Sequence, residues 1–191
     1  MATTRRFVSS DLEAFPDDGQ RYEIIGGELH VSKQPHFNHQ RVCSRLVYKL
    51  QQWVEQGGNG QVVVAPGIIF AEDDDVAPDL VWISAGRMAN TLEPDGKLHG
   101  APELIVEVLS PGAVNEKRDR EAKLLLYSRR GVYEYWIADW RRRRIEVFRR
   151  KKGRLALVDT LDESGALTSP LLPSFECPVA SVFSGISAAS A

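Results

Sequence analysis

The sequence predicts an α/β domain in which strands and helices alternate along the chain. Residues 103–109, ELIVEVL, form a nearly continuous apolar run, which is typical of a central strand buried on both faces. Residues 35–56 carry apolar side chains at helical spacing and end at Gly57-Gly58, which indicates a long amphipathic helix. Residues 132–158 then hold three short strand-like segments, at 132–138, 145–148 and 155–158.

Turn residues and periodicity assign the other segments around these three. A capped short helix is expected at 9–13 and a hairpin around Gly26-Gly27 at 21–31. The pattern also predicts a strand at 61–70 bent at Pro66-Gly67, a solvated turn at 73–75, a strand at 78–83, an irregular loop at 85–101, a charged helix at 116–130 stopped by Gly131, and a tail of loop and short helix at 169–191.

Length and composition favour one domain over residues 1–191, in a cytoplasmic protein. No apolar run reaches the roughly 18 residues of a membrane span, and the first ten residues lack the apolar segment of a secretory signal. The two cysteines, Cys43 and Cys177, lie far apart in unrelated contexts. They suit neither a disulfide framework nor a zinc site, and a reducing compartment is therefore expected.

The formal net charge of −2 hides a strongly uneven distribution. Residues 117–154 hold 15 Lys/Arg against 5 Asp/Glu, whereas the rest of the chain holds 9 against 21. A basic stretch of this kind can bind phosphates if the fold gathers it on one face. The alternative is a set of solvated helix and hairpin faces without a partner.

Two carboxylates interrupt apolar strands, where an unpaired charge is costly. Asp79 precedes Leu-Val-Trp-Ile, and Glu107 lies within Leu-Ile-Val-Glu-Val-Leu. Glu103 is four residues before Glu107, so both side chains point to one face of the strand, but Glu103 stands at its start, where water can solvate it. Asp79 and Glu107 therefore need a cation or hydrogen-bond donors.

Lys123 is the candidate partner, because it is the only lysine from Arg118 to Arg150. Two carboxylates on adjacent strands and a lysine can bind Mg²⁺ or Mn²⁺, position a water molecule and stabilise phosphoryl charge. The alternative is an internal ion pair between Glu107 and Lys123 that only holds the helix to the sheet.

Five segments occur in an order that resembles a known family: YEIIGGEL at 22–29, APDLV at 77–81, ELIVEVLSP at 103–111, KLLLY at 123–127 and GVYEYWIAD at 131–139. Together they resemble the Uma-type family of bacterial proteins assigned as restriction endonucleases, a branch of the PD-(D/E)xK nuclease superfamily. The likeness runs from about residue 12 to 180. It implies a restriction-endonuclease-like mixed β-sheet flanked by helices, with an N-terminal β-hairpin.

The resemblance also implies roles for the site residues. Asp79 and Glu107 match the family's metal-binding acids, with the backbone carbonyl of Val108 as a third ligand. The lysine usual in the superfamily lies two residues after the second acid, where this chain has Leu109. Lys123 matches a lysine moved to the following helix, and this departure leaves open a catalytically altered site.

Four further residues are expected to support the site, and three of them, Glu23, His39 and Glu134, match family positions. Glu23 is a candidate metal ligand or water-orienting group, and His39 a candidate contact for phosphate or a site carboxylate. Glu103 and Glu134 complete the set. Each has an ordinary alternative: a solvent-facing strand glutamate, a helix cap, or strand packing.

The expected function is metal-dependent hydrolysis of DNA phosphodiester bonds by a homodimer, with the apolar edge strands and the segment around Trp136 as candidate interfaces. Two alternatives remain: a nuclease fold that binds DNA or assembles without cutting, and a hydrolase of another phosphate substrate. Six arginines are the candidate contacts to the DNA backbone, and such contacts would weaken with salt: Arg118, Arg120, Arg141, Arg142, Arg143 and Arg144.

Overall fold

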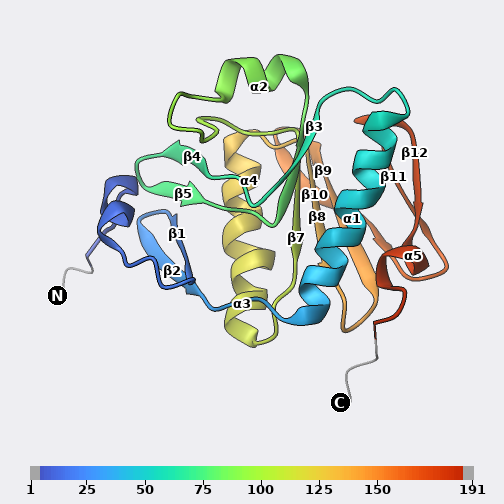
Figure 1. Ribbon diagram of the computed structural model, residues 1–191, viewed down its shortest axis with the longest axis horizontal. Coiled ribbons are helices and arrows are strands. Elements are labelled where there is room, and N and C mark those ends of the chain that lie inside the picture. The colour runs from blue at the N-terminus through green and yellow to red at the C-terminus, as the bar shows by residue number, and fades with distance from the viewer. Residues whose placement is uncertain (1–4, 187–191) are drawn as a thin grey trace.

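A six-stranded mixed sheet forms the centre of the computed structural model, which describes residues 5–186 (Figure 1). The strand order is β10-β9-β8-β7-β6-β3, and only the β7–β8 pair is parallel. Its strands are β3 (Gln61–Val64), β6 (Leu80–Ile83), β7 (Leu104–Val108), β8 (Glu134–Asp139), β9 (Arg144–Lys151) and β10 (Arg154–Leu161).

A smaller sheet, in the order β2-β1-β5-β4, contains the predicted N-terminal hairpin. Gly26 and Gly27, which turn the chain between β1 and β2, both have positive φ, a conformation that two-residue hairpins need and glycine adopts without strain. Its strands are β1 (Arg21–Ile25), β2 (Glu28–Ser32), β4 (Ile68–Ala71) and β5 (Asp74–Val76); a 3₁₀ helix at Ser9–Ala14 precedes them, as expected.

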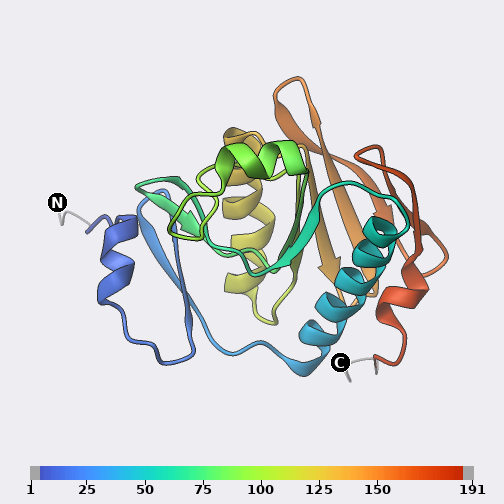
Figure 2. The ribbon, with the colours of Figure 1, turned by 45° about the horizontal axis from the view of Figure 1, so that its top comes forward.

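Helices and the smaller sheet cover the two faces of the central sheet. Helix α1 (Phe37–Glu55), the hairpin of β11 (Ala166–Ser169) and β12 (Leu172–Pro178), and α5 (Val179–Phe183) lie on one side. Helix α4 (Leu124–Arg130) and the smaller sheet lie on the other. Figure 2 shows the N-terminal hairpin and the C-terminal hairpin at opposite ends of the molecule. The predicted mixed sheet with flanking helices is confirmed.

Strand β7 separates two apolar cores and is buried along its whole length, as its apolar run predicted. Leu104, Val106 and Val108 pack in the core beneath α1, whereas Ile105 packs in the core beneath α4. Because side chains alternate along a strand, Glu107 shares the face of Ile105 and points toward α4.

The helix predicted at 116–130 is longer and contains a change of winding. The segment runs through α3 (Ala113–Lys117), a π-helical turn at Arg118–Lys123 and α4. The π turn closes i→i+5 hydrogen bonds, a geometry that is rare and concentrated at functional sites. Lys123 is the last residue of this π turn, and its side chain is fully buried.

The prediction of a solvated turn at Asp73–Asp75 is wrong for two of the three residues. Asp74 and Asp75 belong to β5 and are almost fully buried. Arg130 bonds the Asp74 carboxylate, and Lys97 Nζ lies 3.1 Å from Asp75. These cations come from other segments of the chain, so a reading of local composition could not find them.

Three other expectations need correction. The loop at 85–101 contains α2 (Ala85–Thr91), whose N-cap Ser84 accepts a hydrogen bond from the Arg87 backbone. The single bent strand at 61–70 is two strands in different sheets, β3 and β4. The tail forms the β11–β12 hairpin and α5, and its residues 187–191 lie outside the described part.

Trp136, offered above as part of a dimer interface, is fully buried in the sheet and stacks on Phe175. This side chain therefore belongs to the core and reaches no surface. Within residues 5–186, none of the helices has the length and apolar character to cross a membrane.

Candidate functional site

The strand register brings Asp79 and Glu107 to the same end of the central sheet. Leu80 pairs with Val106 in the antiparallel ladder of β6 and β7, so Asp79, one residue before β6, falls opposite Glu107. The Val108 backbone N–H donates to Asp79 Oδ2 at 2.8 Å and fixes this arrangement. The two acids of the sequence pattern are therefore neighbours.

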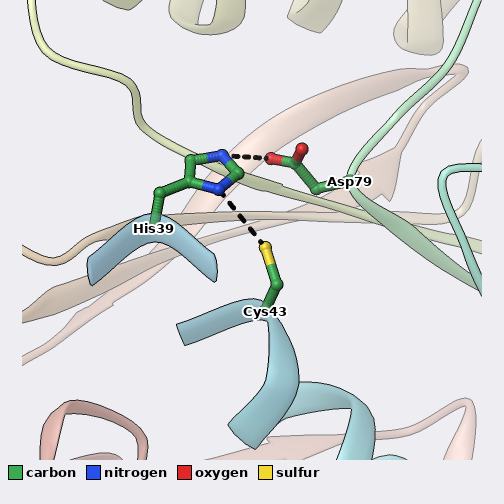
Figure 3. Close-up of side chains that lie close together, drawn as sticks. All are labelled: His39, Cys43 and Asp79. Carbon is green, nitrogen blue, oxygen red and sulfur yellow. Dashed lines mark hydrogen bonds and ion pairs between the residues drawn. The ribbon is translucent and has the colours of Figure 1, made fainter. Parts of the chain in front are cut away.

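Asp79 is buried but has three partners. His39 Nε2 lies 3.1 Å from Oδ2 (Figure 3). Arg21 Nη1 lies 3.1 Å from Oδ1, and the Val108 N–H is the third partner. Burial alone would raise the pKa of Asp79, but the hydrogen bond and charge of His39, with Arg21 and the Val108 N–H, hold that pKa well below its ordinary value. Asp79 is therefore a stable anion.

His39 reaches Asp79 from the first turn of α1. Its neighbour His36 is the helix cap, accepting the Asn38 N–H, so the cap expected at this histidine cluster exists but is not His39. Cys43, one turn later, lies with its sulfur 3.6 Å from His39 Nδ1 (Figure 3). Burial raises the pKa of the Cys43 thiol, so it stays protonated beside the ring.

Glu107 lies in a cluster of buried polar side chains on the α4 side. Lys123 Nζ and the Tyr127 hydroxyl both donate to Glu107 Oε1, at 2.8 and 2.9 Å. Burial raises the pKa of Glu107 to about 8; Lys123 opposes the shift, while the negative charges of Asp79, Asp119 and Glu23 add to it. Without a further cation Glu107 therefore carries a proton near neutral pH.

Lys123 is shared between two carboxylates, since its Nζ also lies 2.9 Å from Glu23 Oε1. The same Glu23 oxygen accepts the Ala77 backbone N–H at 3.0 Å, while Glu23 Oε2 is buried and has no hydrogen-bond partner within residues 5–186. Burial would lower the pKa of Lys123, but Glu107 and Glu23 raise it well above its usual range. The ammonium is therefore permanently charged and fixed.

A pocket of about 370 Å³ opens at this end of the sheet. Asp79, Glu107, Val108, His39 and Arg118 line it, all of them expected at the site. Lys123 and Glu23 do not line it; they lie behind Glu107, connected to the pocket through its carboxylate.

Two cationic lining residues, Arg21 and Lys33, were not found from the sequence. Arg21 carried a usable signal, because it stands two residues before Glu23 on a predicted strand and so shares its face. Lys33 follows the hairpin, in a segment whose path the sequence does not define.

The profile of the Uma2 family, described as "Putative restriction endonuclease", matches residues 9–180. The chain belongs to the Uma2 family. Membership and fold together support a nuclease. A search of curated proteins found no match.

The Uma2-family chain also resembles a solved structure, "a putative nuclease belonging to DUF820 from Anabaena variabilis". The two share 17% sequence identity with a TM-score of 0.74, over 93% of this chain and 98% of that chain. At this identity the likeness shows the fold, and it confirms the restriction-endonuclease-like architecture expected above.

Two residues expected to support the site lie elsewhere in this Uma2-family fold. Glu103 accepts hydrogen bonds from the Ser84 N–H and hydroxyl at the start of α2. Glu134 accepts from Trp136 Nε1 and the Ser169 hydroxyl, and pairs across from Leu104 in the sheet. Both residues lie level with the start of β7, about 10–13 Å from Glu107 along the strand direction. Their hydrogen bonds therefore stabilise the fold and do not belong to the site.

Most of the six arginines expected to contact DNA are paired with carboxylates of the chain. Only Arg118 lines the pocket. The other five form these ion pairs: Arg120 and Arg144 with Glu146, Arg141 with Glu116, Arg142 with Asp139, and Arg143 with Glu163. The basic stretch seen in the sequence is therefore largely neutralised within the fold.

The donor set around the pocket fits a hard divalent cation such as Mg²⁺. Asp79 and Glu107 offer carboxylate oxygens to the pocket, and no hydrogen bond is formed by Glu107 Oε2 within the described chain. Behind them, Glu23 Oε2 is buried without a hydrogen-bond partner among the described residues. His39, Cys43 and Asp79 also form a cluster of metal-ligand types, but the His39 ring already bonds both neighbours and the thiol is protonated.

Proposed function

We propose that this Uma2-family chain is a metal-dependent endonuclease that hydrolyses DNA phosphodiester bonds. The observation that carries the proposal is one pocket in which two carboxylates from adjacent strand ends face two guanidinium groups. Carboxylates supply ligands for Mg²⁺ or Mn²⁺, and guanidinium groups bind phosphate oxygens in a forked geometry. A phosphodiester brings the negative charge that this combination recognises.

The metal, when bound, would polarise a phosphoryl oxygen and lower the pKa of a coordinated water molecule. Asp79 and Glu107 would hold it, with the Val108 carbonyl as the further ligand implied by the family pattern. His39 orients Asp79, so its imidazole fixes which carboxylate oxygen faces the pocket. Because the carboxylates bind the metal, the cationic side chains are the groups that would bind the substrate.

Arg21 and Arg118 are suited to bind the scissile phosphate. Each guanidinium is tied at one side, Arg21 to Asp79 and Arg118 to Asp119, while lining the pocket. Lys123 acts as a positioning residue in this proposal, because its Nζ holds Glu107 from behind. This differs from the direct part in water activation or oxyanion stabilisation that the sequence suggested for Lys123.

Plasmid cleavage tests the proposal. Purified protein with Mg²⁺ or Mn²⁺ should nick or linearise supercoiled plasmid, and Asp79→Asn should reduce the rate about 100-fold or more by removing a metal-binding charge. Glu121→Gln is the matched control, because Glu121 is an exposed acid on the π turn, and it should cut like wild type. Cleavage that survives Asp79→Asn would contradict the proposed centre.

A non-cutting DNA-binding protein is the second candidate. The observations that favour it are the absence of Lys123 from the pocket lining and the engagement of Asp79 by Arg21. No cleavage by wild type, with DNA bound equally by wild type and Asp79→Asn, would support this candidate instead.

The homodimer belongs to the same proposal. One centre per chain cuts one strand, so a dimer should linearise plasmid in a single encounter, whereas a monomer should accumulate nicked circles first. Light scattering gives the mass in solution, and a monomeric mass with only nicked product would remove the dimer from the proposal.

A further inference from the structure

The outer face of α1 carries exposed aromatic side chains beside the pocket. Phe37 is 73% exposed and Tyr48 is 62% exposed, which is unusual for rings of this size. Eleven residues separate them, about three helical turns, so both lie on the same side of the helix. Gln40 and Ser44 stand between them and are also exposed.

A basic stripe runs next to these rings. Arg41, Arg45 and Lys49 repeat every four residues, and Glu55, about two turns beyond Tyr48, is the only acid in the helix. Arg41 and Arg45 donate to the backbone carbonyls of residues 184 and 181, both at 3.2 Å, and Lys49 Nζ stands 5.8 Å from the Tyr48 ring centroid. In the described residues none of the three forms an ion pair with a carboxylate.

This contrasts with the arginines at 141–144, each paired with an acid of the chain. Positive charge without a carboxylate partner therefore lies on α1, as it also does at the turn between β9 and β10, where Lys151, Lys152 and Arg154 form no ion pair within the described residues. A row of cations without acids is complementary to a polyanion.

Two hollows on this face share a lining residue with the pocket. Gln40 lines the pocket of Asp79 and Glu107 and also two hollows of about 510 and 450 Å³ along α1. Tyr48 lines both of these hollows, and Phe37 lines the second. A chain leaving the pocket past Gln40 would therefore meet both rings in turn.

We propose that the outer face of α1 binds an unpaired DNA strand next to the pocket. Phe37 and Tyr48 stack on bases, and Arg41, Arg45 and Lys49 contact the phosphates. Exposed rings can stack only on bases that are not already paired, so the face selects single strands over duplex. The inference rests on the proposed function in one respect only, which is the choice of DNA as the polymer that binds.

Fluorescence anisotropy in EDTA tests this face without any cleavage. An oligothymidylate of about 12 nucleotides, within the range of known site sizes, should bind more tightly than the matching duplex. Tyr48→Ala and Phe37→Ala should each weaken single-strand binding about fivefold or more, whereas Tyr48→Phe should keep it. Tyr133→Ala is the control, because the Tyr133 ring is exposed at its edge while the Arg87 guanidinium lies over its face. This variant should bind single strands like wild type.

The salt dependence of single-strand binding tests the phosphate contacts separately. Lys49→Gln should lower the slope of log affinity against log salt concentration by about 0.7, the value for one phosphate contact on a single strand. An unchanged slope would remove Lys49 from the site.

Three results would overturn the inference: no single-strand binding by wild type, equal binding by Tyr48→Ala, or an equal loss on duplex and single strand. Each differs from failure of the proposed function, which appears as absent metal-dependent plasmid cleavage. A chain that cuts plasmid but binds no oligothymidylate overturns this inference alone. A chain that never cuts can still confirm it.

Discussion

Glu107 is the residue in which the conflict between burial and charge is greatest. It is almost fully buried, and three acidic side chains add negative charge around it while one ammonium, shared with Glu23, opposes them. The apo protein resolves the conflict by protonating Glu107. A divalent cation would resolve it by displacing that proton, so metal binding and deprotonation are linked.

The first prediction concerns the pH dependence of stability. The pKa of Glu107 is about 8 in the folded chain and near 4.5 when unfolded, so between these values the folded state binds more protons. Its contribution to stability is therefore full below pH 4.5 and is lost as pH rises toward 8. Wild type should lose a few kcal/mol relative to Glu107→Gln over this range in urea titrations.

Mn²⁺ should reverse this trend, raising the melting temperature of wild type more at pH 8.5 than at pH 6.5. Equal metal stabilisation at both pH values, or the same response in Glu107→Gln, would show that Glu107 neither holds the proton nor binds the ion.

The second prediction concerns Lys123. Lys123→Met leaves Glu107 and Glu23 buried without their shared cation, so the free energy of unfolding should fall by about 3–5 kcal/mol. Adding Glu23→Gln should recover part of the loss, because the buried charge of Glu23 is then gone. Urea denaturation measures the free energy of unfolding of both variants. A value for Lys123→Met within about 1 kcal/mol of wild type would contradict the ion-pair network.

Among the elements, those with a strong local pattern could be predicted from the sequence. The apolar run gave β7, the helical spacing gave α1, and Gly26-Gly27 gave the first hairpin. The π turn at Arg118–Lys123 could not be predicted, because its residues are ordinary helix formers and the change of winding has no compositional signature. Helix α2 was missed because the glycines and proline at 86–100 were interpreted as a loop.

The third prediction belongs to the end of α4. Gly131 adopts φ +92° at the helix C-terminus, and a Cβ there would meet no atom within 4 Å. Gly131→Ala should therefore cost about 1 kcal/mol through backbone strain alone. Gly86→Ala is the control, since Gly86 is helical with equal space and ordinary φ, and it should be neutral or stabilising; equal urea midpoints for the two would refute the assignment.

Across the whole molecule, the parts of the site that the sequence missed depend on contacts between distant segments. Asp79 and Glu107 were identified because acids inside apolar strands are visible locally. Arg21, which bonds Asp79 across 58 positions of the chain, was not. The arginines at 141–144 were assigned to DNA, but each is paired with an acid in the fold. The partners of Arg141 and Arg143, Glu116 and Glu163, become their neighbours only in the folded chain. Net charge along the sequence therefore overstated the free positive charge at 141–144.

The central claim is a metal centre between the ends of β6 and β7, and anomalous scattering from Mn²⁺-soaked crystals tests it most directly. We predict one peak in the pocket, within about 2.0–2.3 Å of oxygens of Asp79 and Glu107, as expected for a hard cation on carboxylates. The peak should be lost in Glu107→Gln. A peak between His39 and Cys43, or none in the pocket at saturating Mn²⁺, would contradict this account of the site.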